Sequence, residues 1–221
     1  MRANLALVFV AVAGCYPPTA VPTAMHPTAS ANDPSVGVAL GGSYIKQEDS
    51  SLINVPHAEG WIRRPVTPGG QVGIHVAPNV VHGTFRYDVA PVANGVGFAV
   101  EPMIGGSYFR YHNQPADPMQ AEEKESTLTM MIGIVPTLLF PTGSGFGYVS
   151  AKVGFQSSKN LDAQSGQDDT TNSYVVGVSA GIDVGNGVSL ELAVHRLDDA
   201  EDEVMDSPAV WLVVPTIGFR R

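Results

Sequence analysis

The chain has 221 residues and a formal net charge of −9, with 12 Lys and Arg against 21 Asp and Glu. This balance argues against nucleic-acid binding, because affinity for nucleic acid comes mainly from Lys and Arg at phosphates. Only 15% of the residues are charged, against about 25% in typical soluble domains. Glycine accounts for 24 of the 221 residues, which is above the usual ~7%. The composition therefore provides too few charges for an ordinary water-facing surface.

The N-terminus carries an export signal. Arg2 precedes an apolar run that ends in small residues at Cys15, the only cysteine, and this pattern is typical of a secretory signal peptide. Residues 12–15 (Val-Ala-Gly-Cys) resemble the bacterial lipobox. That resemblance implies cleavage of residues 1–14 and acyl chains on the thiol and amino group of Cys15. The alternative is an ordinary signal peptide cut after Ala13, with Cys15 unmodified.

The next segment is predicted to be a tether. Residues 16–34 hold five prolines among Thr, Ala and Ser, a composition that has little to bury and favours an extended chain. We therefore expect residues 15–34 to connect the lipidated cysteine to a domain that occupies residues 35–221. Within that domain no apolar run reaches the about 18 residues of a membrane-spanning helix, which leaves a closed β-barrel as the one way to cross a bilayer.

Alternation with period two, the signature of β-strands, continues through the rest of the chain. Short turns rich in Gly and Asn alternate with long polar loops, which lie near 47–67, 113–125, 157–171 and 198–207. This rhythm predicts eight antiparallel strands in an up-and-down transmembrane barrel, with short turns at one end and long loops at the other. The expected strands are 35–46, 69–90, 96–112, 126–140, 146–156, 173–184, 187–197 and 208–220.

One of these stretches is too long for a single regular strand. Residues 69–90 are twice the ~10 residues that a crossing needs, and their apolar phase slips near Asn79. We favour one strand with a β-bulge at the slip. Two strands joined by a turn at Pro78 and Asn79 would give nine strands and would leave the termini on opposite sides.

The side-chain pattern predicts which face of each strand meets lipid. The apolar phase alternates with Gly, Ala and Ser, which suit the crowded interior of an eight-stranded barrel. Aromatic residues of the apolar phase fall near both strand ends, as in the interfacial belts of membrane proteins. Phe98 and Tyr108 lie about 33 Å apart along a strand, close to the height of the apolar band once tilted. The two predicted belts are Tyr44, Tyr108, Phe155, Tyr174 and Trp211, and Phe98, Phe140 and Phe219.

On these features residues 35–221 resemble the small outer-membrane barrels of the OmpA/OmpX-like kind. The resemblance implies a monomer in the outer membrane, in contact with its lipid, and the acylated Cys15 in the periplasmic leaflet. The chain departs from the family at its C-terminus, since family members usually end on an aromatic residue. Here Arg220 and Arg221 follow Phe219.

Charged residues on the inward phase are candidates for ion pairs inside the barrel, because buried charges need partners. A proton or ion path through the lumen is the alternative. Ser189, Glu191 and His195 share this phase, but their spacing matches no nucleophile motif, and we expect no catalysis. The candidate lumen residues are Arg86, Asp88, Glu101, Lys152, Asp183, Glu191 and His195, with His75 and His82 nearby.

An acidic run at residues 198–206 could bind divalent cations, since hard oxygen ligands suit Ca²⁺ or Mg²⁺. It lacks the spacing of a calcium loop, and a solvated loop is the alternative. The histidines show no zinc-site spacing, and we expect no cofactor.

Taken together, the sequence predicts a lipid-anchored, non-catalytic outer-membrane barrel of structural or surface-interaction type. Two alternatives stay open: a lipid-tethered, lipocalin-like soluble barrel that binds an apolar ligand, and a narrow ion channel. The soluble barrel would turn its apolar side chains into the lumen, whereas a membrane barrel, with or without a channel, would turn them outward.

Overall fold

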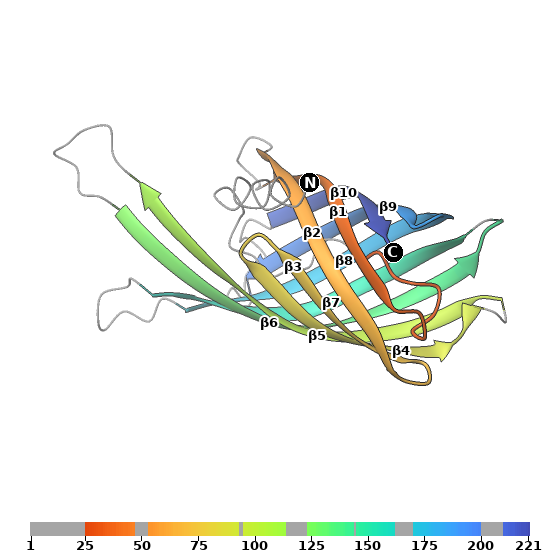
Figure 1. Ribbon diagram of the computed structural model, residues 1–221. Helices are drawn as coiled ribbons and strands as arrows, with labels where there is room; N and C mark the ends of the chain where they lie inside the picture. Colours follow the sequence, from red (N-terminus) through yellow and green to blue (C-terminus); the bar gives the residue numbers. More distant parts are fainter. Residues whose placement is uncertain are drawn as a thin grey trace.

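Ten antiparallel strands form a closed barrel (Figure 1). The computed structural model describes residues 25–46, 53–92, 95–113, 123–143, 145–161, 170–199 and 210–221. Among them, no helix is long and apolar enough to span a membrane. The strands are β1 (Ser35–Lys46), β2 (Ile53–Thr67), β3 (Gly70–Ala77), β4 (Val80–Ala90), β5 (Gly97–Asn113), β6 (Glu123–Pro141), β7 (Phe146–Asn160), β8 (Thr170–Gly185), β9 (Val188–Asp199) and β10 (Val210–Arg220).

Each strand pairs with its neighbours in the chain, and β1 pairs with β10 to close the cylinder. At this closing seam Val38 lies opposite Phe219. Next to the seam the backbones of Val36 and Arg221 exchange two hydrogen bonds, of 3.1 and 2.9 Å. The predicted all-β, up-and-down architecture is therefore confirmed, but the predicted number of eight strands is wrong.

The barrel has two distinct ends. The start of β1, the end of β10 and the connections β2–β3, β4–β5, β6–β7 and β8–β9 lie at one end, which we call the turn end. The β8–β9 turn there needs a left-handed backbone at Asn186 (φ 54°) and Gly187 (φ 78°), which these residues adopt readily. At the opposite end, the loop end, β5 and β6 extend beyond the other strands (Figure 1).

The first error in the strand count is β2, because residues 47–67 were expected to form a loop. On this strand four successive inward residues are all large, whereas on most other strands large inward residues alternate with Gly, Ala, Ser or Thr. His57, Glu59, Trp61 and Arg63 point inward and are buried. On the outer face, Ile62 and Val66 are the exposed large apolar residues. The prediction of strands relied on large apolar residues that alternate with small ones. On β2 the inward positions hold large residues, so this alternation is absent.

The second error concerns residues 69–90, where the favoured single bulged strand is wrong. The chain reverses at Pro78 and Asn79, and β3 pairs with β4 as a hairpin. Asn79 has a φ of 62°, and Pro followed by a residue of positive φ suits a tight turn. Paired residues such as Val76 and Val81 have opposite parity, so the outward phase must switch at the turn. The two errors each add one strand, so the number stays even, and the start of β1 and the end of β10 still lie at the same end of the barrel.

Along most strands, exposed apolar side chains on the outer face alternate with small or polar side chains on the inner face. On β8, for example, Val176 and Val178 are exposed, whereas Gly177 and Ser179 are buried. Most of the buried side chains on the inner face are polar or charged, and small apolar clusters lie between them. Polar groups thus fill the interior and apolar groups cover the exterior.

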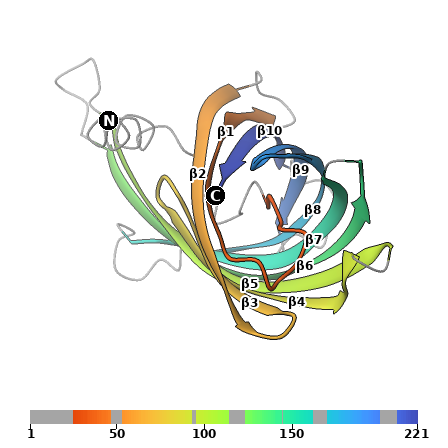
Figure 2. The ribbon, with the colours of Figure 1, turned by 45° about the vertical axis from the view of Figure 1, so that its right-hand side comes forward.

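The lumen also holds part of the N-terminal segment, which was expected to be a tether. Residues 25–28 and Ala31 are buried, and Figure 2 shows this segment, in red, within the ring of strands. An eight-stranded barrel is just wide enough for its own side chains to fill, and ten strands enclose more space. Residues 25–31 occupy part of that space.

We expect Gly41→Ala to weaken the β1–β10 seam. A Cβ at Gly41 would overlap the Pro215 carbonyl and the Thr216 methyl group. Backbone cannot move aside cheaply, so the loss in unfolding free energy should be about 1–3 kcal/mol. Urea unfolding of the refolded protein measures it. Gly60→Ala is the matched control, since the nearest atom lies 3.7 Å from its Cβ; an equal loss in both variants would contradict this assignment.

Candidate functional site

The candidate site is the inner wall of the lumen where it holds residues 25–34, which we call the lumen segment. Its first anchor is the buried carboxylate of Glu191 on β9. The backbone N–H of Met25 donates to both carboxylate oxygens at 3.0 Å, and that of His26 donates to Oε2 at 2.8 Å. The Tyr148 hydroxyl donates to the same Oε2 at 2.6 Å. A buried carboxylate needs such donors, and here the peptide backbone supplies most of them.

The second anchor is Arg63 on β2, whose side chain is 1% exposed. Its Nη2 donates to the Met25 carbonyl at 2.6 Å, and its Nη1 donates to the His26 carbonyl at 2.9 Å. Nη2 also donates to His75 Nε2 at 3.0 Å and lies 3.8 Å from Glu101. The planar fork of an arginine suits such parallel acceptors, so Glu191 and Arg63 together hold both sides of the Met25–His26 backbone.

The ring of His26 fixes the depth of the segment in the lumen. Nδ1 lies 2.8 Å from Ser189 Oγ, and Nε2 lies 2.9 Å from Thr216 Oγ1. The ring stacks on Trp61 with centroids 5.3 Å apart and an interplanar angle of 11°. A Cβ at Gly218 would overlap this ring, so glycine at that position makes room for it.

The same ring lies beside a serine and a carboxylate, but it does not form a hydrolytic relay. Glu191 Oε2 lies 3.9 Å from Nδ1, the nitrogen that already faces Ser189. A catalytic triad places the acid on the nitrogen opposite the nucleophile. Here that opposite nitrogen faces a threonine hydroxyl instead.

Further contacts follow the segment toward the turn end. Arg86 Nη1 donates to the Thr28 carbonyl at 2.7 Å, and the Ala31 N–H donates to Asp88. Gln71 Nε2 donates to the Asp33 carbonyl at 2.6 Å. These bonds also hold main-chain atoms, so the wall grips the peptide backbone along its length.

The segment runs from the barrel interior toward the turn end. Met25 packs in an apolar cluster with Met103, Met131, Val135 and Val175, which lie toward the middle of their strands. At the other end of the segment, the side-chain carbonyl of Asn32 accepts a hydrogen bond from the N–H of Gly69 in the β2–β3 turn, at 3.0 Å. The chain therefore emerges from the lumen where β1 begins.

All seven candidate lumen residues lie on the inner wall. Arg86 pairs with Asp88 (Nη2–Oδ1, 2.8 Å), and Asp183 pairs with Arg220 (2.7 Å). Glu101 lies near Arg63, which the sequence analysis did not select, and Glu191 holds the lumen segment. Lys152 and His195 are buried in the same lumen. Glu191, Arg86 and Asp88 thus share one partner, because each of them is hydrogen-bonded to the backbone of the lumen segment.

The residues that the sequence analysis missed lie mainly on β2. Arg63 is one of them, and Glu59 lies 3.2 Å from both His57 Nε2 and His75 Nδ1. The signal for them was the alternation of His57, Glu59, Trp61 and Arg63 within the expected loop. His26 and Tyr148 were also missed, because neither a proline-rich segment nor a β7 aromatic predicts a lumen contact.

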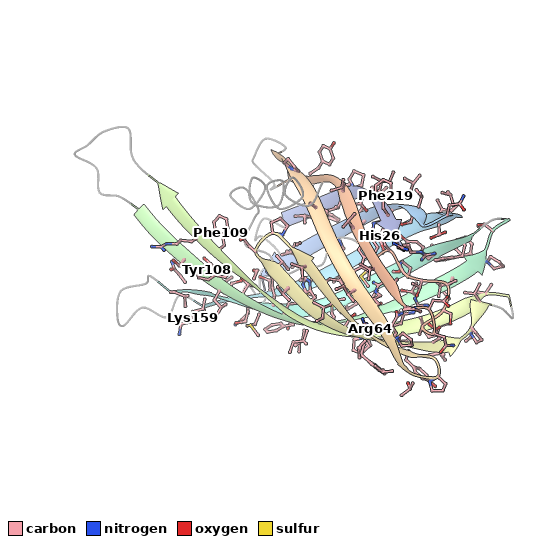
Figure 3. The ribbon with its side chains drawn as sticks, in the orientation of Figure 1. His26, Arg64, Tyr108, Phe109, Lys159 and Phe219 are labelled. Carbon is pink, nitrogen blue, oxygen red and sulfur yellow. The ribbon has the colours of Figure 1, made fainter. Side chains whose placement is uncertain are left out.

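The predicted belt residues all lie on the outer face. Figure 3 shows Tyr108 and Phe219 on the outside of the cylinder and His26 within it. The side chains of Tyr44 and Phe98 are half-buried among their neighbours, and the others are exposed. The exposed belt residues are Tyr108, Phe140, Phe155, Tyr174, Trp211 and Phe219.

The described residues contain no group of three or more His, Cys, Asp or Glu side chains placed to hold a metal ion. Of the acidic run 198–206, Asp198 forms an exposed ion pair with Arg196 (2.8 Å). Residues 200–206 lie outside the described residues, as do the expected signal peptide and Cys15.

Comparisons with known proteins show a weak likeness to solved barrels. No protein-family model and no curated protein sequence matches this chain. The outer membrane enzyme PagL is 12% identical, with a TM-score of 0.40 over 84% of this chain and 98% of that one. Neisserial surface protein A is 13% identical, with a TM-score of 0.39 over 84% of this chain and 96% of that one. A third solved structure is the Yersinia pestis attachment invasion locus protein Ail in complex with the heparin analogue sucrose octasulfate. It is 11% identical, with a TM-score of 0.40 over 86% of this chain and 99% of that one. At these values the likeness carries no functional argument.

We expect Arg63→Met to destabilise the barrel strongly. The substitution removes the positive charge next to Glu101 and leaves two buried carbonyls without their donor. Breaking a buried charge pair costs about 3–5 kcal/mol. Equilibrium unfolding in urea measures the loss. The neighbouring Arg64 is exposed, so Arg64→Met should change stability by no more than about 0.5 kcal/mol. Similar losses in the two variants would show that Arg63 does not anchor the segment.

Proposed function

We propose that this chain is a lipid-anchored, non-catalytic outer-membrane β-barrel of structural or surface-interaction type, with a lumen closed by its own N-terminal segment. The observation that carries the proposal is the apolar outer face. Large hydrophobic side chains are exposed on each of the ten strands, all the way around the barrel, from Val36 on β1 to Phe219 on β10. Soluble monomers rarely expose contiguous apolar patches beyond a few hundred Å².

The position of the polar groups argues against the soluble carrier. A lipocalin-like barrel would turn its apolar residues inward around an oily ligand. In this chain the lumen instead contains charged pairs and the polar contacts of the lumen segment, and most of the valines and leucines face outward. A bilayer is the environment that matches this arrangement, because lipid accepts an apolar exterior and a closed barrel leaves no backbone group unpaired.

Two features support a structural or surface-interaction role over an open channel. The lumen segment lies across the interior and is bonded to β2, β4 and β9. At the loop end the β5–β6 hairpin extends past the rim (Figure 1), where it would be available to partners outside the cell. Loops and hairpins at such a rim are where binding specificity usually lies.

The anchor is part of the proposal. The lipobox-like residues 12–15 support acylation of Cys15, which would retain the chain at the membrane in addition to the barrel. With both strand termini at the turn end, we place that end in the periplasm.

The first test separates an integral barrel from a tethered soluble one. We expect Cys15→Ser protein to stay in the membrane pellet after carbonate extraction, because the barrel itself crosses the bilayer. The unsubstituted protein is the control for recovery. Release of the Cys15→Ser protein into the supernatant would mean that the acyl chains alone held it.

The second test probes the outer face directly. Val178 lies mid-strand on β8 and is 57% exposed, so Val178→Arg should cost about 2–4 kcal/mol of stability in phospholipid vesicles. Val184→Arg, on the same face of β8 but at its turn end, should cost about 0–1 kcal/mol. If both arginines are tolerated equally, this face meets water.

A further inference from the structure

The wall of the lumen recognises a peptide backbone rather than a particular set of side chains. Glu191 accepts the N–H groups of Met25 and His26, and Arg63 donates to the carbonyls of the same two residues. Near the turn end, Arg86 donates to one further carbonyl and Asp88 accepts one further N–H. Main-chain contacts of this kind would hold any short peptide that can enter and adopt the same backbone shape, with a positive φ of 35° at its second residue and a turn from Ser30 to Asp33.

One side chain adds selectivity to these contacts. The His26 ring fits between two hydroxyl groups and stacks on Trp61. The other side chains of the segment are small, polar or proline, except for Met25 in its apolar cluster. A ligand with Met and His at its first two positions would therefore match the site, and one with a different second residue would lose the ring contacts.

The wall that grips the segment is itself polar and charged. Without the segment, Glu191, Arg63, Arg86 and Asp88 would face an open interior and require water as their partner. An outer-membrane barrel whose interior is lined in this way and left open holds a water-filled path. The segment thus occupies the place where water and ions would otherwise pass.

We propose that the lumen is a binding site for a short peptide, and that residues 25–34 are its built-in ligand and act as a removable plug of the barrel. The conductance part rests on the proposed membrane function. The peptide-binding part does not, because it can be measured in detergent micelles.

The first experiment uses Trp61 as a reporter of the plug. The chain has two tryptophans, so full-length Trp211→Phe protein reports Trp61 alone. In this background the double variant His26→Pro, Ala31→Pro removes two N–H donors to Glu191 and Asp88 together with the ring stack. We expect its Trp61 emission to shift to longer wavelength as water enters the lumen. Arg64→Met in the same background is the control, because Arg64 is exposed and contacts no part of the proposed site, and its spectrum should match that of the parent.

The second experiment returns the ligand in trans. A synthetic peptide of residues 25–34 (MHPTASANDP) should reverse the emission shift of the double variant in a saturable manner. A scrambled peptide of the same composition should not. Adding Glu191→Gln to the double variant should weaken peptide binding at least tenfold. Equal effects of both peptides, or no reversal by the native one, would overturn the peptide site.

The third experiment asks whether the segment closes a path. In planar bilayers the unsubstituted protein should be silent, whereas the folded double variant should show discrete openings that the native peptide suppresses. Folding is checked by circular dichroism and by heat-modifiable migration on gels. If the double variant does not fold, Met25→Pro, which removes one donor only, replaces it. Silence of the folded variant, despite a reversible Trp61 shift, would overturn the plug while leaving the peptide site intact.

Discussion

The structure depends on how the interior of a ten-stranded barrel is filled. An eight-stranded cylinder can be closed by its own inward side chains, whereas this one encloses additional space and a dense set of charges. Glu191 and Arg63 would be costly to bury alone, because each has several hydrogen-bonding positions that need partners. The peptide bond supplies a donor and an acceptor in every residue, so a single stretch of backbone satisfies both groups. The width of the barrel, its charged wall and the inserted segment therefore depend on one another.

The same logic explains the unusual composition. A protein that turns its apolar face outward needs few surface charges, and its ionisable groups gather inside. His26, His57, His75, His82 and His195 are scattered in the sequence but are all buried in the lumen. Sequence spacing conceals this gathering, because neighbouring positions in the lumen come from strands that lie far apart in the chain. A low charge count in the whole chain thus coexists with a locally crowded ionic interior.

Sequence reasoning could predict the fold class and the two faces of most strands, because period two is a local property. Val178 and Gly177, for instance, differ enough to be assigned to opposite faces without any knowledge of the fold. It could not predict β2, whose inward Trp61 and Arg63 reverse the size contrast seen elsewhere. It also could not predict that His26 lies in the lumen. That placement depends on Ser189 and Thr216, more than 160 positions away, and no local pattern carries such information.

The lumen segment has a consequence for how the cylinder closes. Its backbone is bonded to Arg63 on β2, and its histidine ring to Ser189 and Thr216 on β9 and β10. Those strands lie on opposite sides of the β1–β10 junction, which pairs the two extremes of the chain. Pairings between such distant residues carry the largest entropic cost during folding. The inserted peptide acts as an internal brace across that junction, because it is bonded to strands on both of its sides.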